Sequence, residues 1–338
     1  MTTVAPTLFD HLASLTDEYG TFEHAEFDAP RQEHGYCVDD VARVLVVTSR
    51  EARPTEQVDS LAVGSLAFIR ASQTPRGGCR NRRSADGKWT SRPTTDDCWG
   101  RSLWGLGEAA SNGENSRNTE ALRLFEIGAR ARSRWPRAMS FASLGAAAVL
   151  NVQPTNAMAI SLLRDAASKM NAGKDDRTWP WPEPRLTYAN AVIPEAMIAT
   201  GVSLGRDELV LKGLQLLRWL IARETSGDHL SVTPAGGSGP LDAGPGFDQQ
   251  PIEVATLADA CARALAVDGA SDWLRTLQMA NAWFDGLNDG NVVMWDERTG
   301  GGYDGLMAKT VNLNQGAEST LALISTRQRA LKFLAVAS

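Results

Sequence analysis

The sequence has few cysteines and histidines and no long hydrophobic run, and each shortage excludes a class of protein. Its 4 cysteines show no CxxC motif and no paired spacing, so neither a zinc site nor a disulfide framework is expected. Its 4 histidines are scattered and form no HExxH motif, which gives no support to a metal hydrolase. No stretch approaches the roughly 18 consecutive apolar residues of a membrane span, and the first residues lack the pattern of a signal peptide. We therefore expect a soluble, cytoplasmic protein with no membrane partner, no metal and no cofactor.

Positive charge is also scarce. Lys and Arg together number 34 against 40 Asp and Glu, which gives a net charge of −6. Because binding to a phosphate backbone requires clustered Lys and Arg, a nucleic-acid partner is not expected. The hydrophobic content of 43% and the charged content of 22% are typical of a globular chain. The 338 residues have the length of one large domain or of two ordinary ones.

Helix-period patterns of apolar residues recur along the whole chain, whereas strand signals are scarce. The patterns predict helices at residues 6–18, 39–52, 56–72, 96–111, 117–133, 137–150, 155–171, 193–204, 206–222, 251–267, 271–287, 314–325 and 328–337. Apart from the first, these helices pair into six hairpins.

The connections between the predicted helices alternate in length. Those within a hairpin are short, and those between hairpins are long, except for the brief link near Pro136. In a closed ring of antiparallel hairpins, every long connection enters an inner helix from the same end, and long loops are usually functional. The segment "SFASLGAAAVL" is apolar or small all round, as an inner helix requires, and "LVLKGLQLLRWLIARE" is amphipathic, as an outer helix requires. The sequence therefore predicts an all-α protein: a single (α/α)6 toroid over residues 1–338.

Carboxylates and amides mark the starts of the predicted inner helices. Two acid pairs stand in "GYCVDDVARVL" and "PTTDDCWGRSLWGL", and amides precede a glutamate in "LTYANAVIPEA", "GFDQQPIEVA" and "VNLNQGAEST". The one inner helix without such residues also lacks a long loop. Each acid alone is compatible with a helix cap, a dipole contact or a local ion pair, since Arg43 and Arg101 lie at helical spacing from acids. Their recurrence together favours one shared site.

This mixture of side chains suits carbohydrate chemistry. Carboxylates and amides pair with hydroxyls that both donate and accept, and aromatic rings cover the apolar faces of a sugar. Glycosyl transfer to water uses one protonated acid and a second carboxylate, and crowding acids raises one pKa. The catalytic candidates are Asp40, Asp97, Glu253 and Glu318, followed by Asp39 and Asp96. The substrate-binding candidates are Tyr36, Arg43, Trp99, Arg101, Trp181, Tyr188, Asn190, Glu195, Gln249, Gln250, Tyr303, Asp304, Asn314 and Gln315.

In these blocks, which lie between Glu33 and Ser319, the chain resembles the six-hairpin glycosidase-like (α/α)6 superfamily. More narrowly, it resembles a bacterial group of (α/α)6 domains found alone or beside glycosyltransferases. The resemblance implies a toroid with a carbohydrate-active face, and with it a functional link to a glycosyltransferase. Inverting hydrolysis is common in the wider superfamily. The narrower group favours Asn after the first acid pair, where this chain has Val41, and a ligand contact at that position would change the substrate preference.

We expect a glycoside hydrolase that inverts configuration with an acid/base carboxylate pair and acts on an oligo- or polysaccharide. Several alternatives stay open. A sugar epimerase or isomerase usually depends on His, and only His34 lies beside a motif. A lyase, a phosphorylase, a non-catalytic glycan-binding module and a calcium site of loop carboxylates are also compatible with the pattern. Isoprenoid chemistry is disfavoured, because Arg43 and Gly100 stand where a third Asp is needed.

Overall fold

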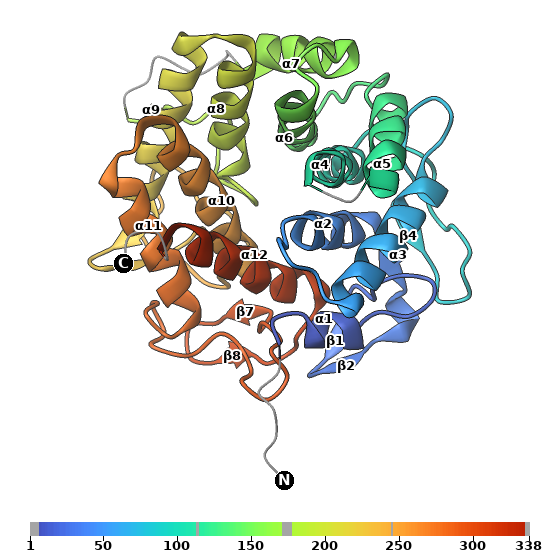
Figure 1. The fold of residues 1–338 in the computed structure, drawn as a ribbon. Coiled ribbons are helices and arrows are strands. Elements are labelled where there is room, and N and C mark those ends of the chain that lie inside the picture. The colour runs from blue at the N-terminus through green and yellow to red at the C-terminus, as the bar shows by residue number, and fades with distance from the viewer. Residues whose placement is uncertain (1–6, 113–114, 171–177, 245, 335–338) are drawn as a thin grey trace.

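The computed structural model describes residues 7–112, 115–170, 178–244 and 246–334, and this part of the chain folds into a ring of helices. The inner ring consists of α2 (Val38–Ser49), α4 (Asp97–Asn112), α6 (Pro136–Val152), α8 (Val192–Leu204), α10 (Pro251–Asp268) and α12 (Ala317–Leu334). The outer helices are α3 (Glu56–Ser72), α5 (Asn115–Gly128), α7 (Ala157–Met170), α9 (Asp207–Arg223) and α11 (Ser271–Phe284). Each inner helix contacts the next, and α12 contacts α2, which closes the ring (Figure 1). The predicted all-α toroid is confirmed.

Composition separates the inner helices from the outer ones. In α6, every residue from Arg137 to Leu150 is buried, as the pattern of small and apolar residues predicts. In α9, only one stripe is buried, with Leu209, Leu217 and Leu220 among its members. Small residues also let α4 and α6 pack backbone to backbone. A Cβ atom on Gly145 would lie 2.0 Å from the carbonyl oxygen of Leu103, so this position excludes any larger residue.

The sixth hairpin differs from the prediction. Residues 317–334 form the single helix α12, where two helices at 314–325 and 328–337 were expected. The segment "STRQ" contains no Gly or Pro, and its polar side chains bond to the helices instead of forming a turn. The Thr326 hydroxyl donates to the carbonyl oxygen of Ala322 at 2.9 Å, and the Gln328 amide donates to that of Val47 at 2.9 Å. The first helix, α1 (Asp10–Ser14), is also shorter than the expected 6–18, and it lies against α12.

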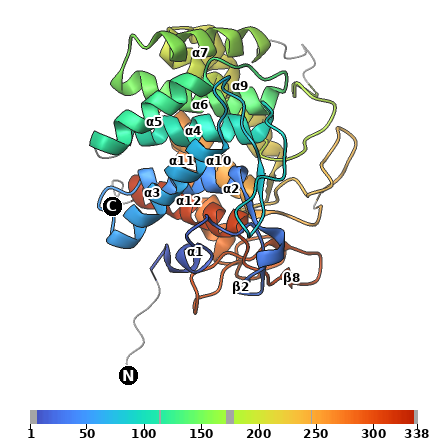
Figure 2. The ribbon, with the colours of Figure 1, turned by 90° about the vertical axis from the view of Figure 1, so that its right-hand side faces the viewer.

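The long connections gather on one side of the helical layer (Figure 2). They carry four antiparallel two-stranded sheets: β1 (Ala25–Glu26) with β2 (Ala29–Pro30), β3 (Tyr36–Cys37) with β4 (Arg82–Arg83), β5 (Thr225–Ser226) with β6 (His229–Leu230), and β7 (Gly305–Leu306) with β8 (Val311–Asn312). Because β3 directly precedes α2, its pairing with β4 holds the 73–96 connection over the start of that helix. The expected elaborated face is therefore present at the N-terminal ends of the inner helices. No helix in the described ranges is long and apolar enough to cross a membrane.

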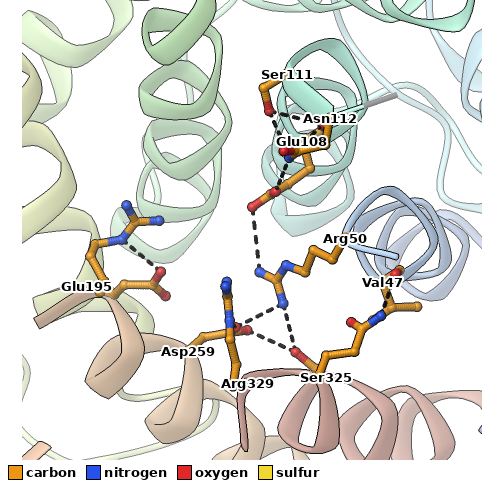
Figure 3. A network of polar contacts seen from close by, with 11 residues as sticks. Val47, Arg50, Glu108, Ser111, Asn112, Glu195, Asp259, Ser325 and Arg329 are labelled. Atoms are coloured by element: carbon orange, nitrogen blue, oxygen red, sulfur yellow. Dashed lines mark hydrogen bonds and ion pairs between the residues drawn. The ribbon is translucent and has the colours of Figure 1, made fainter. Parts of the chain in front are cut away.

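A buried charge network joins the inner helices away from this face (Figure 3). Asp259 on α10 accepts from Arg50 Nη1 at 2.9 Å and from Arg329 Nε at 2.6 Å. Arg50, which directly follows α2, also pairs with Glu108 on α4 at 3.6 Å. The side chain of Asp259 is only 3% exposed, so its two arginines compensate a charge that water does not reach. The network links α2, α4, α10 and α12 across the point where the ring closes.

Replacing Asp259 with Asn should destabilise the fold strongly, because it leaves the positive charges of Arg50 and Arg329 buried without their partner. We expect a loss of about 3–5 kcal/mol in the free energy of unfolding, measured by urea denaturation followed by circular dichroism. Glu208→Gln is the matched control, since the Glu208 side chain is 80% exposed and pairs with Lys212 on the surface of α9. A loss below about 1 kcal/mol for Asp259→Asn would contradict the role of the network.

Candidate functional site

A cleft of about 410 Å³ opens on the elaborated face. It is lined by Glu23, His24, Cys37, Asp39, Asp40, Arg43, Arg101, Asp248, Gln250, Asp304, Asn312, Asn314, Gly316, Glu318 and Ser319. These residues come from the first turns of α2 and α12, from α4, from the start of α10 and from the loops between them. The structure thus brings together eight predicted site residues that are far apart in the sequence, among them Asp304 from the loop before β7.

The wall formed by α2 and α12 contains an arginine between two carboxylates. Arg43 Nη2 donates to Asp40 and also to Glu318 Oε2 at 2.9 Å. Asp40 is buried and accepts a second bond from the Cys37 thiol at 3.0 Å. Burial raises the pKa of Asp40, although the Arg43 guanidinium opposes this shift. The side chain of Glu318 is 37% exposed, and it is the member of this group that offers a carboxylate to the cleft.

Asp39, the other member of the first acid pair, is held by a separate set of partners. Its Oδ2 atom accepts from Asn81 Nδ2 at 2.9 Å, and its Oδ1 atom lies 3.4 Å from Arg101 Nη1. The Arg101 guanidinium also lies over the ring of Phe141, 4.7 Å from its centroid. Both arginines of the cleft are therefore engaged with acids of the protein. The local ion pair expected for Arg43 is present, whereas Arg101 pairs with Asp39 of another helix.

Two further acids of the cleft, Asp304 and Asp248, have no ion pair with an arginine in the described ranges. Asp304 Oδ1 accepts from the backbone N–H of Gly316 at 2.9 Å, and burial, together with the nearby charges of Glu318 and Asp40, raises the pKa of Asp304 to about 6. Burial also raises the pKa of Asp248. A Cβ atom on Gly305 would lie 2.1 Å from Asp248 Oδ1, so Gly305 is required for this carboxylate to approach the β7 backbone.

The pKa values of two carboxyl groups in this cleft, Glu318 and Asp304, are thus shifted in opposite directions. Burial alone would raise the pKa of Glu318, but the Arg43 and Arg101 guanidiniums lower it below its ordinary value. Asp304 retains its proton to a higher pH than an ordinary aspartate. Such a contrast supplies a proton donor and an ionised carboxylate in one site.

The second acid pair lies at the start of α4 and contacts two aromatic rings. Asp96 Oδ1 accepts from Trp135 Nε1 at 2.9 Å. Asp97 Oδ2 accepts from the Tyr188 hydroxyl at 2.5 Å. Neither aspartate is among the residues that line the 410 Å³ cleft, although Arg101, one turn after Asp97 on α4, is.

Glu253, a predicted catalytic residue, instead supports the loop before α8. It accepts from the backbone N–H of Asn190 at 3.1 Å, from the Asn190 side-chain amide at 3.1 Å and from the backbone N–H of Ala189. It is buried, and burial together with the neighbouring Glu224 raises the pKa of Glu253 to about 8. Asn190 is buried as well, so both residues position the loop that carries Tyr188.

Several predicted binding residues are instead part of the packed interior. The Trp99 indole donates to the carbonyl oxygen of Gly128 at 3.0 Å, and Trp181 stacks on Trp219 with ring centroids 6.0 Å apart. Tyr36 is buried, and its hydroxyl donates to Asp17 Oδ2 at 2.7 Å. Trp99 lies within α4, and the loop that carries Trp181 folds back onto the helices, so both rings face the core.

Of the remaining predicted binding residues, some lie in the interior and others line the cleft. Glu195 is buried in an ion pair with Arg263 at 3.0 Å, close to the network of Figure 3. Gln249 and Gln315 are buried, and their side-chain amides bond to Asp289 and Asp296. Tyr303 packs against the larger hydrophobic cluster. Gln250 and Asn314 do line the cleft, and Asn314 Oδ1 accepts from the backbone N–H of Phe27 at 2.9 Å.

The cleft also contains residues to which the sequence analysis gave no role. His24 and Glu23 belong to the 15–37 connection, and no helix start marks them. Asp248 is part of the block "GFDQQPIEVA", where the amides drew attention instead. Burial and the adjacent His34, whose ring centroid lies 4.9 Å away, lower the pKa of His24, so its imidazole is neutral near pH 7.

One group in the described ranges has the spacing of metal ligands. Single ligand atoms of Glu23, Cys37 and Asp40 lie within 4.8 Å of one another. However, Arg82 pairs with Glu23 and Arg43 pairs with Asp40, so positive charge already compensates both carboxylates. This arrangement disfavours a cation at the group.

In comparisons of sequence, no family model and no curated protein matches the chain. Solved structures do resemble it. A sugar epimerase from a ruminal bacterium has 12% identity and a TM-score of 0.73, with 98% of this chain and 96% of that chain covered. A D-mannose isomerase has 10% identity and a TM-score of 0.71, with 96% of each chain covered. A GH76 alpha-mannanase from Bacteroides thetaiotaomicron has 10% identity and a TM-score of 0.63, with 98% of this chain and 95% of that chain covered.

At these identities the likeness shows the fold alone. It confirms the expected (α/α)6 toroid. Membership of the narrower bacterial group stays a prediction.

The buried acids Glu224 and Glu253 should make stability depend on pH. Burial raises the pKa of Glu224 from its ordinary value of 4.5 to about 7, so the folded protein keeps a proton that the unfolded chain has lost. The resulting stability is complete below about pH 4.5 and is lost as the pH rises to about 8.

Glu224→Gln should lower stability at pH 5, because it buries an amide, but it should flatten the decline between pH 5 and 7. Urea denaturation at half-unit intervals of pH measures this slope, which is at most about 1.4 kcal/mol per pH unit for one proton. Glu208→Gln should keep the wild-type slope. An unchanged slope in Glu224→Gln would show that Glu224 is already ionised in the fold.

Proposed function

We propose that the protein is a carbohydrate-active enzyme, and that it is a glycoside hydrolase in which Asp304 is the general acid and Glu318 the general base. The observation that carries this proposal is the single cleft containing both carboxyl groups, one with a raised pKa and one with a lowered pKa. Hydrolysis of a glycosidic bond needs this combination of a protonated and an ionised carboxyl.

The roles follow from the surroundings of each group. The leaving oxygen needs a proton, and Asp304 still holds one near pH 6. The attacking water needs a base, and the charges of Arg43 and Arg101 keep Glu318 ionised. Gln250 and Asn314 lie on the cleft, where amides can pair with sugar hydroxyls. Inversion of the anomeric centre is the outcome we propose, as expected from the superfamily resemblance.

Asp40 is less suited to catalysis than the sequence suggested. It is buried, and its two oxygens accept from Arg43 and Cys37. We propose that it fixes Arg43, which in turn holds Glu318. Asp39 has the corresponding role for Arg101.

An epimerase is the second candidate, and one observation favours it. His24 lines the cleft as a neutral imidazole, which can take up a proton from a carbon atom. Two of the similar structures are named as a sugar epimerase and a D-mannose isomerase. An epimerisation leaves the mass of the substrate unchanged and, in D2O, places solvent deuterium on carbon. His24→Asn would abolish such a product and would leave hydrolysis intact.

A glycosyltransferase as functional partner and a cytoplasmic location also stay proposals. The first is supported by the resemblance of the sequence blocks.

The acid and base roles predict different responses to the leaving group. Asp304→Asn should lower turnover of gluco- and manno-oligosaccharides by about 10²–10⁴-fold, because their leaving oxygen needs a proton. It should have a much smaller effect on dinitrophenyl glycosides, whose leaving group needs none. Glu318→Gln should slow both kinds of substrate, since both require activated water. Reducing-sugar assays and dinitrophenolate absorbance measure the two rates.

The kcat/KM of the wild type should fall above about pH 6, where Asp304 loses its proton. Glu208→Gln, on the outer surface of α9, should behave as the wild type. Proton NMR of the first product formed reports the anomer directly. Full activity of both Asp304→Asn and Glu318→Gln would refute the assignment, and retained configuration would exclude inversion.

A further inference from the structure

The rings of Tyr188 and Trp135 are the most exposed aromatic surfaces that contact an acid pair. Tyr188 is 40% exposed and Trp135 is 46% exposed, whereas most tryptophans of the chain lie in the core. Exposure of a large ring on a monomer needs no explanation by itself. Here, however, each ring is fixed in place by several polar contacts.

Tyr188 lies between α4 and α6. Its hydroxyl donates to Asp97 at 2.5 Å, and the Arg137 guanidinium lies over its ring, 4.8 Å from the centroid. Arg137 is itself fixed, since its Nε donates to the carbonyl oxygen of Tyr188 at 2.7 Å and its Nη1 to Glu183 at 2.6 Å. One ring face is therefore covered by a rigid cation, and the exposed area belongs to the rest of the ring.

Trp135 repeats this arrangement with the neighbouring aspartate. Its indole N–H donates to Asp96 at 2.9 Å, and the Arg134 guanidinium lies 4.4 Å from the ring centroid. Because Asp96 and Asp97 are adjacent in the sequence, both rings are anchored at the start of α4. Trp135 directly precedes α6, the inner helix that contributes no carboxylate of its own.

The contacts explain why the chain carries a second acid pair. The carboxylates of Asp96 and Asp97 each accept from a ring, so they act as positioning residues for an aromatic surface. An aromatic face held rigid, with carboxylate oxygens at its edge, fits the apolar C–H face and the hydroxyl rim of a pyranose ring. Holding the rings in advance lowers the entropy cost of binding.

We propose that Trp135 and Tyr188, oriented by Asp96 and Asp97, form an outer subsite that stacks on a pyranose unit beyond the 410 Å³ cleft. The inference rests on the proposed action on carbohydrate. It makes the substrate an oligosaccharide or polysaccharide long enough to reach from the cleft to these rings, because neither ring lines the cleft. Arg101 lines the cleft and follows Asp97 by one turn of α4, so the same helix contributes to both regions.

The test compares ligand length in the full chain. Linear gluco- and manno-oligosaccharides of two to six units serve as probes, and saturation-transfer NMR measures binding without requiring turnover. Trp135→Ala should weaken binding of the five- and six-unit probes by about three- to tenfold and leave binding of the two-unit probes unchanged. In turnover assays, KM for the long probes should rise by the same factor while kcat stays constant.

Conservative variants separate stacking from a structural role. Trp135→Phe should recover most of the binding, because it keeps an aromatic face. Asp96→Asn should be milder than Asp96→Ala, since the Asn oxygen still accepts from the indole. Tyr19→Ala is the matched control: Tyr19 is 38% exposed with Arg83 lying 5.3 Å from its ring centroid, but it is not among the residues of the cleft or of the proposed subsite.

Each outcome decides the proposal. A loss confined to long probes supports it. An equal loss of binding on short and long probes overturns it. So does a result in which the wild type and Trp135→Ala bind every probe equally, or in which neither protein binds any probe. The proposed hydrolase fails separately if no probe is cleaved, and in that case a length-dependent loss of binding still supports the subsite.

Discussion

The common direction of the inner helices is the constraint on which the rest of this structure depends. An outer helix returns the chain between each inner helix and the next, so the N-termini of the inner helices gather at one end of the ring. The positive ends of the helix dipoles favour carboxylates in first turns, which reduces the cost of placing Asp40 on α2 and Glu318 on α12 close together. Long connections reach the same end and complete the cleft. The opposite arrangement, with inner helices in mixed directions, would scatter these acids over two faces.

Two arginines then determine what each acid can do. Arg43 binds both Asp40 and Glu318, and Arg101 faces Asp39, so the acids on the wall of α2 and α12 are compensated. Among the described residues, Asp304 has no such partner, and burial raises its pKa. The difference between the pKa values of Glu318 and Asp304 therefore arises from the placement of two guanidiniums and not from the number of acids. A site with the same carboxylates and differently placed arginines would have different chemistry.

The ring separates this polar cleft from a second set of charges that is closed to water. Asp259, Arg50 and Arg329 join helices that are far apart in the sequence, across the place where α12 meets α2. Burying charges in this way is costly unless every partner is present, so the network favours one closed arrangement of the helices over near alternatives. A closed ring is in turn what holds Glu318 against Arg43. Closure and the geometry of the cleft are physically linked through the seam between α2 and α12.

Much of this was readable from the sequence, because helix periodicity, loop length and the residues at helix starts are local properties. They predicted the toroid, the side that carries the long loops, and half of the residues that line the cleft. The split of α12 was wrong, since polar residues such as Thr326 and Gln328 bond to neighbouring helices where a turn was expected. Trp181 was assigned to the cleft, but its loop folds back and buries the ring.

The role of each acid was decided only by tertiary structure. Arg43 and Glu318 are 275 residues apart, yet their contact is what keeps that glutamate ionised. Likewise, nothing near Asp96 in the sequence reveals Trp135 as its partner. Periodicity and composition determine which segments become helices, because those properties act within a few turns. The pKa of a side chain depends on charges and burial supplied by other segments, and only the closed ring brings those together.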